Sequence, residues 1–168
     1  RFRLDSWLPP DTIPPRYWEL PAMLRLFASL IVLIATSSLV VAAGLDWPQW
    51  RGPNRDGISN ETGLLDAWPE EGPKLLWQVD GLGKGYAGTA ISGGRIFTLG
   101  QKKEVGTVLE AFDLQDGKPL WETPIGEGNP NCTPTVDGDL VYGLGREGDL
   151  VCCEAATGKL VWKKNFGD

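Results

Sequence analysis

The chain has 168 residues, a formal net charge of −6 and no histidine. An acidic chain repels polyanions, so nucleic acid is excluded as the main partner, and the lack of imidazole removes the commonest general base and metal ligand. The 22 glycines, 13 prolines, eight tryptophans and single methionine favour short strands joined by tight turns over long helices.

The first 43 residues have the character of a targeting region rather than of a folded domain. Residues 1–22 precede the only methionine, Met23, and we interpret them as a non-native or disordered upstream segment. Residues 23–43 contain Arg25, an apolar stretch and then small residues ahead of Gly44, which is the pattern of a cleaved secretory signal peptide. An uncleaved anchor is the alternative, because the stretch is just long enough to span a bilayer. We expect a hydrophobic signal helix, export to the bacterial periplasm or cell envelope, and membrane contact only through this segment if it is uncleaved.

Residues 44–84 are predicted to be an opening segment with part of a repeat unit. The stretch Gly83–Gly88 matches G-x-G-x-x-G, but a β-run follows at Thr89 where a dinucleotide site needs a helix. We therefore interpret it as a loop between sheets. Arg51 and Arg55 are expected to pair with nearby carboxylates, with an anionic ligand as the alternative.

From residue 85 onward the sequence repeats itself. Leu109–Trp121 aligns without a gap to Leu150–Trp162, and three tryptophans, Trp77, Trp121 and Trp162, are spaced 44 and 41 residues apart. Four-stranded units repeated at this spacing are typical of propeller blades. The predicted fold class is all-β, a partial β-propeller of about two four-stranded blades plus an opening strand, with residues 85–168 forming the two blades. The expected strands are 89–92, 95–99, 108–113 and 120–124, and then 133–136, 140–143, 149–154 and 160–163.

Two copies of one motif resemble the tryptophan-docking pattern A-x-D-x-x-T-G-x-x-x-W of the quinoprotein-type (pyrroloquinoline-quinone-like) β-propeller repeat family. A degenerate third copy ends at Trp77. The resemblance implies that each tryptophan packs on the glycine-containing turn of a neighbouring blade, which makes these residues structural. The motif residues are Ala111, Asp113, Gly117 and Trp121 in the first copy, and Glu154, Thr157, Gly158 and Trp162 in the second.

The three cysteines, Cys132, Cys152 and Cys153, have neither zinc-site spacing nor a disulfide framework, so we expect small, partly buried side chains. The run Cys152-Cys153-Glu154 also resembles the adjacent cysteines beside the cofactor of quinone-dependent alcohol dehydrogenases. Packing within a strand is the expectation, and contact with a cofactor is the alternative. No catalytic residue and no metal ligand are predicted in this sequence.

A closed propeller has four to eight blades, so we expect this chain to be the N-terminal part of a longer protein. The resemblance implies two possible functions. The first is an exported, non-catalytic propeller, like the outer-membrane assembly lipoproteins of this repeat class, that binds a protein partner or a small ligand on a propeller face without a cofactor. The alternative is a dehydrogenase that uses pyrroloquinoline quinone and Ca²⁺, with its catalytic residues in blades outside this sequence.

Overall fold

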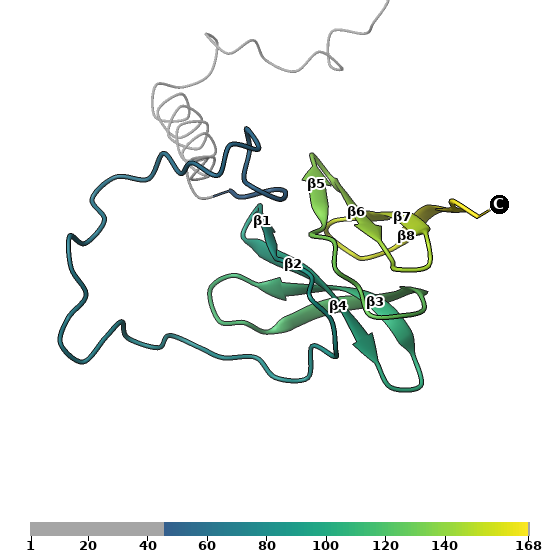
Figure 1. The fold of residues 1–168 in the computed structure, drawn as a ribbon, viewed down its shortest axis with the longest axis horizontal. Helices are drawn as coiled ribbons and strands as arrows, with labels where there is room; N and C mark the ends of the chain where they lie inside the picture. Colours follow the sequence, from purple (N-terminus) through teal and green to yellow (C-terminus); the bar gives the residue numbers. More distant parts are fainter. Residues whose placement is uncertain (1–45, 168) are drawn as a thin grey trace, which may run out of the picture. The chain divides into compact units, whose positions relative to one another are not determined.

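The structure is a computed structural model that describes residues 46–167, so the upstream segment and the predicted signal helix lie outside the described residues. Within this range there is no helix, and eight strands form two four-stranded antiparallel sheets with the orders β1-β2-β3-β4 and β5-β6-β7-β8. Figure 1 shows the two sheets next to each other. The strands are β1 (Ala90–Ser92), β2 (Arg95–Lys102), β3 (Gly106–Asp113), β4 (Pro119–Gly126), β5 (Thr135–Asp137), β6 (Leu140–Leu144), β7 (Asp149–Glu154) and β8 (Leu160–Asn165).

The all-β prediction is confirmed, and each expected strand has an observed counterpart. The second and third strands of the first sheet are longer than expected, because pairing continues to Lys102 opposite Gly106. In contrast, β5 begins only at Thr135, two residues later than predicted. Pro134 precedes it and has no N–H to donate to a ladder, which accounts for the late start.

The inner hairpin of each sheet turns on glycine. Gly93 and Gly94 both have positive φ, 57° and 74°, as a tight two-residue hairpin requires. In the second sheet Asp137 pairs with Leu140, so the turn residues are Gly138 and Asp139. Only Gly138 there has positive φ.

The core lies between the two sheets. Because side chains alternate along a strand, each sheet has one face towards the other sheet and one face away from it. The first sheet contributes Phe97, Leu99 and Leu109, and the second contributes Val141 and Val151, all with 4% exposure or less. The registers show that the two sheets meet through non-equivalent faces. The first sheet packs with the face that carries Trp121, whereas the second sheet packs with the face opposite to the one that carries Trp162.

The opening segment contacts the innermost strand of each sheet. Trp47 exchanges two backbone hydrogen bonds with Ile91 of β1, 2.8 and 2.9 Å long, and the N–H of Val136 in β5 donates to the carbonyl of Pro48 at 2.8 Å. Asp46 accepts a hydrogen bond from the Ser92 hydroxyl at 2.8 Å. These residues therefore connect the two sheets at their inner edges. In Figure 1 the chain then makes a long excursion without regular structure before it reaches β1.

Candidate functional site

The tryptophan of the first sheet lies on the glycine of the second. The indole N–H of Trp121 donates to the carbonyl of Ala155 at 3.1 Å, and the Thr123 hydroxyl donates to the carbonyl of Gly158 at 2.6 Å. A Cβ at Gly158 would lie 2.5 Å from the Trp121 ring, and Gly158 has a φ of +72°. Only glycine suits both the backbone angle and this close approach. The ring of Phe97 completes the contact, with its centroid 5.9 Å from that of Trp121.

The same arrangement recurs one unit earlier but not one unit later. A Cβ at Gly117, whose φ is +71°, would lie 2.7 Å from the ring of Trp77 and 2.9 Å from a methyl of Val79. Trp162 is 38% exposed, and its nearest aromatic neighbour is Tyr142, at 6.1 Å between centroids. The structure therefore brings Trp121 together with Gly158, and Trp77 with Gly117, while no glycine turn of the described residues covers Trp162.

The acidic motif residues form the outer turns. Asp113 accepts the N–H of Gln115 at 2.7 Å through its side chain and the N–H of Gly117 at 2.9 Å through its carbonyl. Glu154 accepts the Thr157 hydroxyl at 2.7 Å, and its carbonyl accepts the N–H of Gly158 at 2.8 Å. The Thr157 bond lowers the pKa of Glu154, with a further contribution from Lys159. Ala111 is fully buried in β3 and belongs to the core between the sheets.

The adjacent cysteines are strand residues with buried, free thiols. Cys152 and Cys153 lie in β7 opposite Tyr142 and Val141, and both are fully buried. Cys153 belongs to the core between the sheets. Burial raises the pKa of the Cys153 thiol to about 11, and neighbouring Cys152 adds to the shift. Such a thiol is a poor nucleophile and a poor metal ligand near neutral pH.

The Ca²⁺ of the alternative function would require a group of oxygen ligands. Between residues 46 and 167 no group of three or more Cys, Asp or Glu side chains is arranged to hold a metal ion. The pair Cys152 and Cys153 is enclosed by the sheet rather than directed into a pocket, since both thiols are at 0% exposure.

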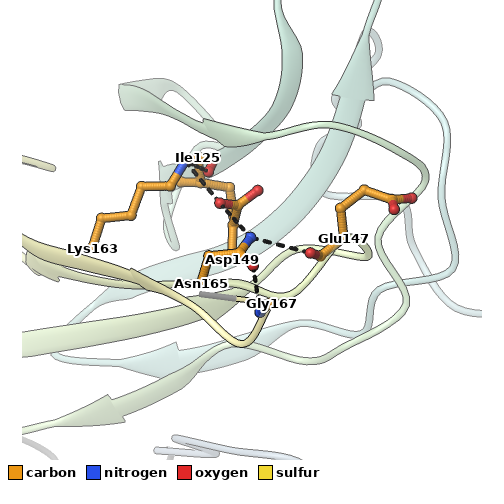
Figure 2. Close-up of polar contacts among 6 residues, drawn as sticks. All are labelled: Ile125, Glu147, Asp149, Lys163, Asn165 and Gly167. Carbon is orange, nitrogen blue, oxygen red and sulfur yellow. Dashed lines mark hydrogen bonds and ion pairs between the residues drawn. The ribbon is translucent and has the colours of Figure 1, made fainter.

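A polar cluster that the sequence did not single out joins the two sheets (Figure 2). The ammonium of Lys163 in β8 donates to the carbonyl of Ile125 in β4 at 2.7 Å and pairs with Asp149 at 3.0 Å. Asn165 donates to the same carboxylate at 3.1 Å. These two bonds, with that of Lys163 first, lower the pKa of Asp149. The repeat alignment could not reveal the cluster, because the position of Lys163 is occupied by Glu122 in the first unit.

A second polar group that sequence reasoning missed lies on the opposite face of the first sheet. Glu110 in β3 is 3% exposed, its Oε2 lies 2.7 Å from the ammonium of Lys102, and its Oε1 is buried without a hydrogen-bond partner among the described residues. Burial raises the pKa of Glu110, and Lys102 offsets this only in part. Lys102 also pairs with Glu122. The available signal was a glutamate inside the otherwise apolar run Val108–Phe112.

The glycine-rich loop before β1 lies against the corresponding loop before β5. The N–H of Tyr86 donates to the carbonyl of Pro130 at 2.8 Å, and Lys84 exchanges backbone hydrogen bonds of 2.7 and 2.9 Å with Gln101. A Cβ at Gly85 would lie 2.9 Å from that Pro130 carbonyl. Within the described residues this loop precedes the first sheet, and a strand rather than a helix follows it. It leaves the Tyr86 side chain 86% exposed.

The expectation that Arg51 and Arg55 pair with carboxylates is wrong. Arg51 donates to the backbone carbonyl of Asp56 at 3.1 Å, and Arg55 donates to the side-chain carbonyl of Gln49 at 2.9 Å. Both arginines have positive φ, 65° and 58°, so the chain doubles back tightly. In such a turn the backbone carbonyls and Gln49 lie nearer to the guanidinium groups than the carboxylates do.

Comparison with known proteins identifies a family. The family profile described as outer membrane protein assembly factor BamB matches residues 61–142 and again 104–168. The BamB protein of Xanthomonas campestris pv. campestris is 32% identical over 108 residues, which are 58% of this chain and 24% of that protein. The 1-butanol dehydrogenase (cytochrome c) of Thauera butanivorans is 32% identical over 87 residues, which are 51% of this chain and 12% of that protein.

This chain thus spans about a quarter or less of the length of the curated relatives that it matches, 24% and 12%. Among solved structures, BamB from Moraxella catarrhalis is similar over 55% of this chain and 28% of that one, with 18% identity and a TM-score of 0.46. Among residues 46–167 no helix has the length and apolar character needed to cross a membrane.

Proposed function

Because the chain belongs to the family of the outer membrane protein assembly factor BamB, we propose that it is an exported, non-catalytic β-propeller repeat protein. In this proposal it serves in the bacterial cell envelope as a scaffold that binds a protein partner or a ligand. The name of the Xanthomonas relative, an assembly factor for outer membrane proteins, supports a protein partner in that compartment.

The observation that supports a binding role most directly is the contact between the loop before β1 and the loop before β5, at one end of the sheets. There the backbone bond between Tyr86 and Pro130 fixes the loops, and the Tyr86 side chain is 86% exposed. A rigidly held, exposed aromatic residue is the kind of anchor that protein interfaces use. The motif residues Trp121 and Gly158, in contrast, are engaged with each other. We propose that they dock neighbouring blades and that partner recognition belongs to the loops.

A photo-crosslinking amino acid at position 86 tests this proposal in cells that export the protein. We expect a covalent adduct with an envelope protein from position 86 and a much weaker one from position 118. Lys118 is a suitable control because its side chain is 77% exposed and it lies in the β3–β4 turn, at the other end of the sheet. Equal adducts from both positions, or none from position 86, would contradict the proposed surface.

Export is tested separately, by the mass of the protein recovered from the periplasm. The proposal predicts a mature N-terminus at Gly44, which follows the small residues Ala42 and Ala43. Recovery of an intact N-terminal segment in the membrane fraction would instead support the anchor. Both outcomes leave the folded residues 46–167 unchanged, so this measurement does not depend on the scaffold role.

The second candidate is a dehydrogenase dependent on pyrroloquinoline quinone and Ca²⁺, whose catalytic residues lie outside this sequence. The similarity to the Thauera 1-butanol dehydrogenase favours it. The two candidates separate in one assay, in which the complete protein is incubated with the quinone and Ca²⁺ and then tested for dye-linked alcohol oxidation. Turnover would support the dehydrogenase. An inactive protein that still gives the position-86 adduct would support the scaffold.

A further inference from the structure

The loop of residues 49–57, which we call the arginine loop, carries two arginines without a carboxylate partner. No ion pair in the described part of the chain includes Arg51 or Arg55, although the chain as a whole has a formal net charge of −6. The side chain of Asp56 instead accepts a backbone N–H two residues further along, at 2.9 Å. Both arginines are exposed. The loop is therefore a cationic spot on an acidic chain.

The backbone of the arginine loop is held by its own hydrogen bonds and by packing. The N–H of Gly52 donates to the carbonyl of Gln49 at 3.0 Å, and the N–H of Gly57 donates to the carbonyl of Arg51 at 2.9 Å. A Cβ at Gly52 would lie 2.8 Å from the ring of Trp47, whose own backbone pairs with β1. A loop that is ordered in advance loses little conformational freedom when a partner binds.

Part of each guanidinium group is engaged within the loop. Nη2 of Arg51 donates to the carbonyl of Asp56 at 3.1 Å, and its guanidinium carbon lies 5.4 Å from the centroid of the Trp50 ring. Nε of Arg55 donates to the side-chain carbonyl of Gln49 at 2.9 Å, and its two terminal nitrogens have no hydrogen-bond partner between residues 46 and 167. Two parallel N–H donors are what a carboxylate accepts from arginine. The Trp50 side chain beside them is 65% exposed, so an apolar surface adjoins the cations.

The arginine loop begins at the end of the sheets where Tyr86 lies. Trp47 and Ile91 form an antiparallel bridge, and Asp46 bonds to Ser92 at the end of β1. The chain after Trp47 therefore runs towards the start of β1, where the preceding loop carries Tyr86. One partner can thus contact the arginine loop and the exposed tyrosine together.

We propose that the arginine loop binds an acidic segment of a protein partner, in which an aspartate or glutamate adjoins an apolar residue. The carboxylate accepts two hydrogen bonds from the terminal nitrogens of Arg55, and the apolar neighbour covers Trp50. Tryptophan and arginine are the residues that most often contribute strongly to protein interfaces. A nucleic acid or an anionic membrane fits less well, because an extended anion would meet the negative charge of the rest of the chain. This inference rests on the proposed binding role, for which it names the chemistry of the partner.

Selection from a random dodecapeptide library displayed on phage tests that chemistry. The full chain is immobilised, and the peptides that it retains are compared with those retained by the Arg51→Gln, Arg55→Gln chain. We expect the parent to enrich peptides in which Asp or Glu adjoins an apolar residue, and the variant to show no such enrichment. The inference is overturned if the parent enriches no peptides, if its peptides lack acidic residues, or if both chains retain the same acidic peptides.

The affinity of a labelled peptide from this selection, measured by fluorescence anisotropy, tests the geometry. Arg55→Gln should weaken binding about tenfold, as the loss of a charge-assisted hydrogen-bonded pair does. Arg55→Lys should weaken it nearly as much, because an ammonium group cannot offer two parallel donors. Trp50→Ala should also weaken it. The unfolding midpoint of each variant, measured in parallel, shows whether the fold is kept.

Arg146→Gln is the matched control for these substitutions. Arg146 is also exposed, but its Nε already lies 3.8 Å from a carboxylate oxygen of Glu147. This variant should bind the peptide as the parent does. Equal losses from Arg55→Gln and Arg146→Gln would show a general attraction between charges and would overturn the inference.

Photo-crosslinking from position 86 separates this inference from the proposed function. The adduct that the parent forms should weaken in the Arg51→Gln, Arg55→Gln chain. An adduct of unchanged strength in that variant overturns the inference and leaves the proposed function standing. Selection of acidic peptides by a chain that gives no adduct contradicts the Tyr86 surface alone and supports the inference.

Discussion

The two sheets carry the same motif in different surroundings. In the first sheet the tryptophan, Trp121, donates a hydrogen bond to Ala155 and contacts Gly158 of its neighbour. In the second sheet Trp162 is 38% exposed and contacts Tyr142 of its own sheet. Motif identity therefore does not determine the contribution of a residue to stability. That contribution depends on whether the face of a neighbouring sheet covers the residue, and substitutions in the two sheets measure the difference in stability.

The largest difference is expected between the two tryptophans. Trp121→Ala removes a ring from between the sheets and should lower the free energy of unfolding by about 3 kcal/mol, as core truncations of aromatic residues do. Trp162→Ala removes a more exposed ring and should cost about 1 kcal/mol or less. Urea denaturation of both variants, followed by circular dichroism, gives the two values. Equal costs would mean that the contact of Trp121 with Gly158 contributes little.

The glycine side of the same contact gives the next largest effect. Gly158→Ala combines a positive φ of +72° with a Cβ that would lie 2.5 Å from the Trp121 ring, so we expect a loss of about 2–3 kcal/mol. Gly138→Ala is the matched control, because its φ is +56° but no atom lies within 4 Å of the added Cβ. The control should lose only about 1 kcal/mol from backbone strain. A similar loss in both variants would show that φ alone requires glycine.

A smaller effect, with a defined pH dependence, is expected at Glu110. Burial raises the pKa of this carboxyl above its ordinary value of 4.5, so the folded state holds the proton more tightly than the unfolded state does. Its contribution to stability is therefore fully present below pH 4.5 and is lost as the pH rises through the folded-state pKa. Glu110→Gln should remove this pH dependence. At pH 7 the variant should be at most about 1 kcal/mol less stable than the parent. Denaturation midpoints between pH 4 and pH 7 measure both points.

The smallest effect on stability, but a clear one on reactivity, concerns the thiols. Cys132 is half-buried in the loop before β5, whereas Cys152 and Cys153 are fully buried. In the native state iodoacetamide should modify Cys132 alone, with mass spectrometry as the readout. Since the pKa of Cys153 is raised from 9.0 to about 11, the unfolded state should lose this proton first, and stability should fall as the pH rises above about 9. Modification of Cys153 as fast as Cys132 would contradict the burial.

Much of the fold was predictable because the responsible signals are local. Gly93-Gly94 can adopt the positive φ of a tight hairpin wherever it occurs, and alternating apolar residues such as Phe97 and Leu99 mark one face of a strand. The spacing of the repeat also predicted that each unit has four strands. The late start of β5 at Thr135 departs from the prediction because Pro134 has no N–H to donate to a ladder.

The polar contacts were not predictable from the repeat, because they use positions at which the units differ. Lys163 bonds to Ile125 of the other sheet, while its counterpart Glu122 bonds to Lys102 within its own sheet. Lys102 lies at the end of β2, in the segment Gly100–Gly106, which is longer than the corresponding segment Gly145–Gly148 of the second unit. The prediction that Arg51 and Arg55 pair with carboxylates was wrong for a similar reason. Their partners depend on how a loop with two positive φ angles folds back.

The sequence by itself determined the number of strands in each unit and their approximate positions, since these depend on the repeat and on the alternation of apolar residues along a strand. Only the tertiary structure decided which copy of the motif is covered and which is open: Trp121 lies between two sheets, whereas Trp162 does not. The physical reason is that the burial and hydrogen bonding of a side chain depend on the surface that packs against it, whereas the alternation of apolar residues is a property of a single strand.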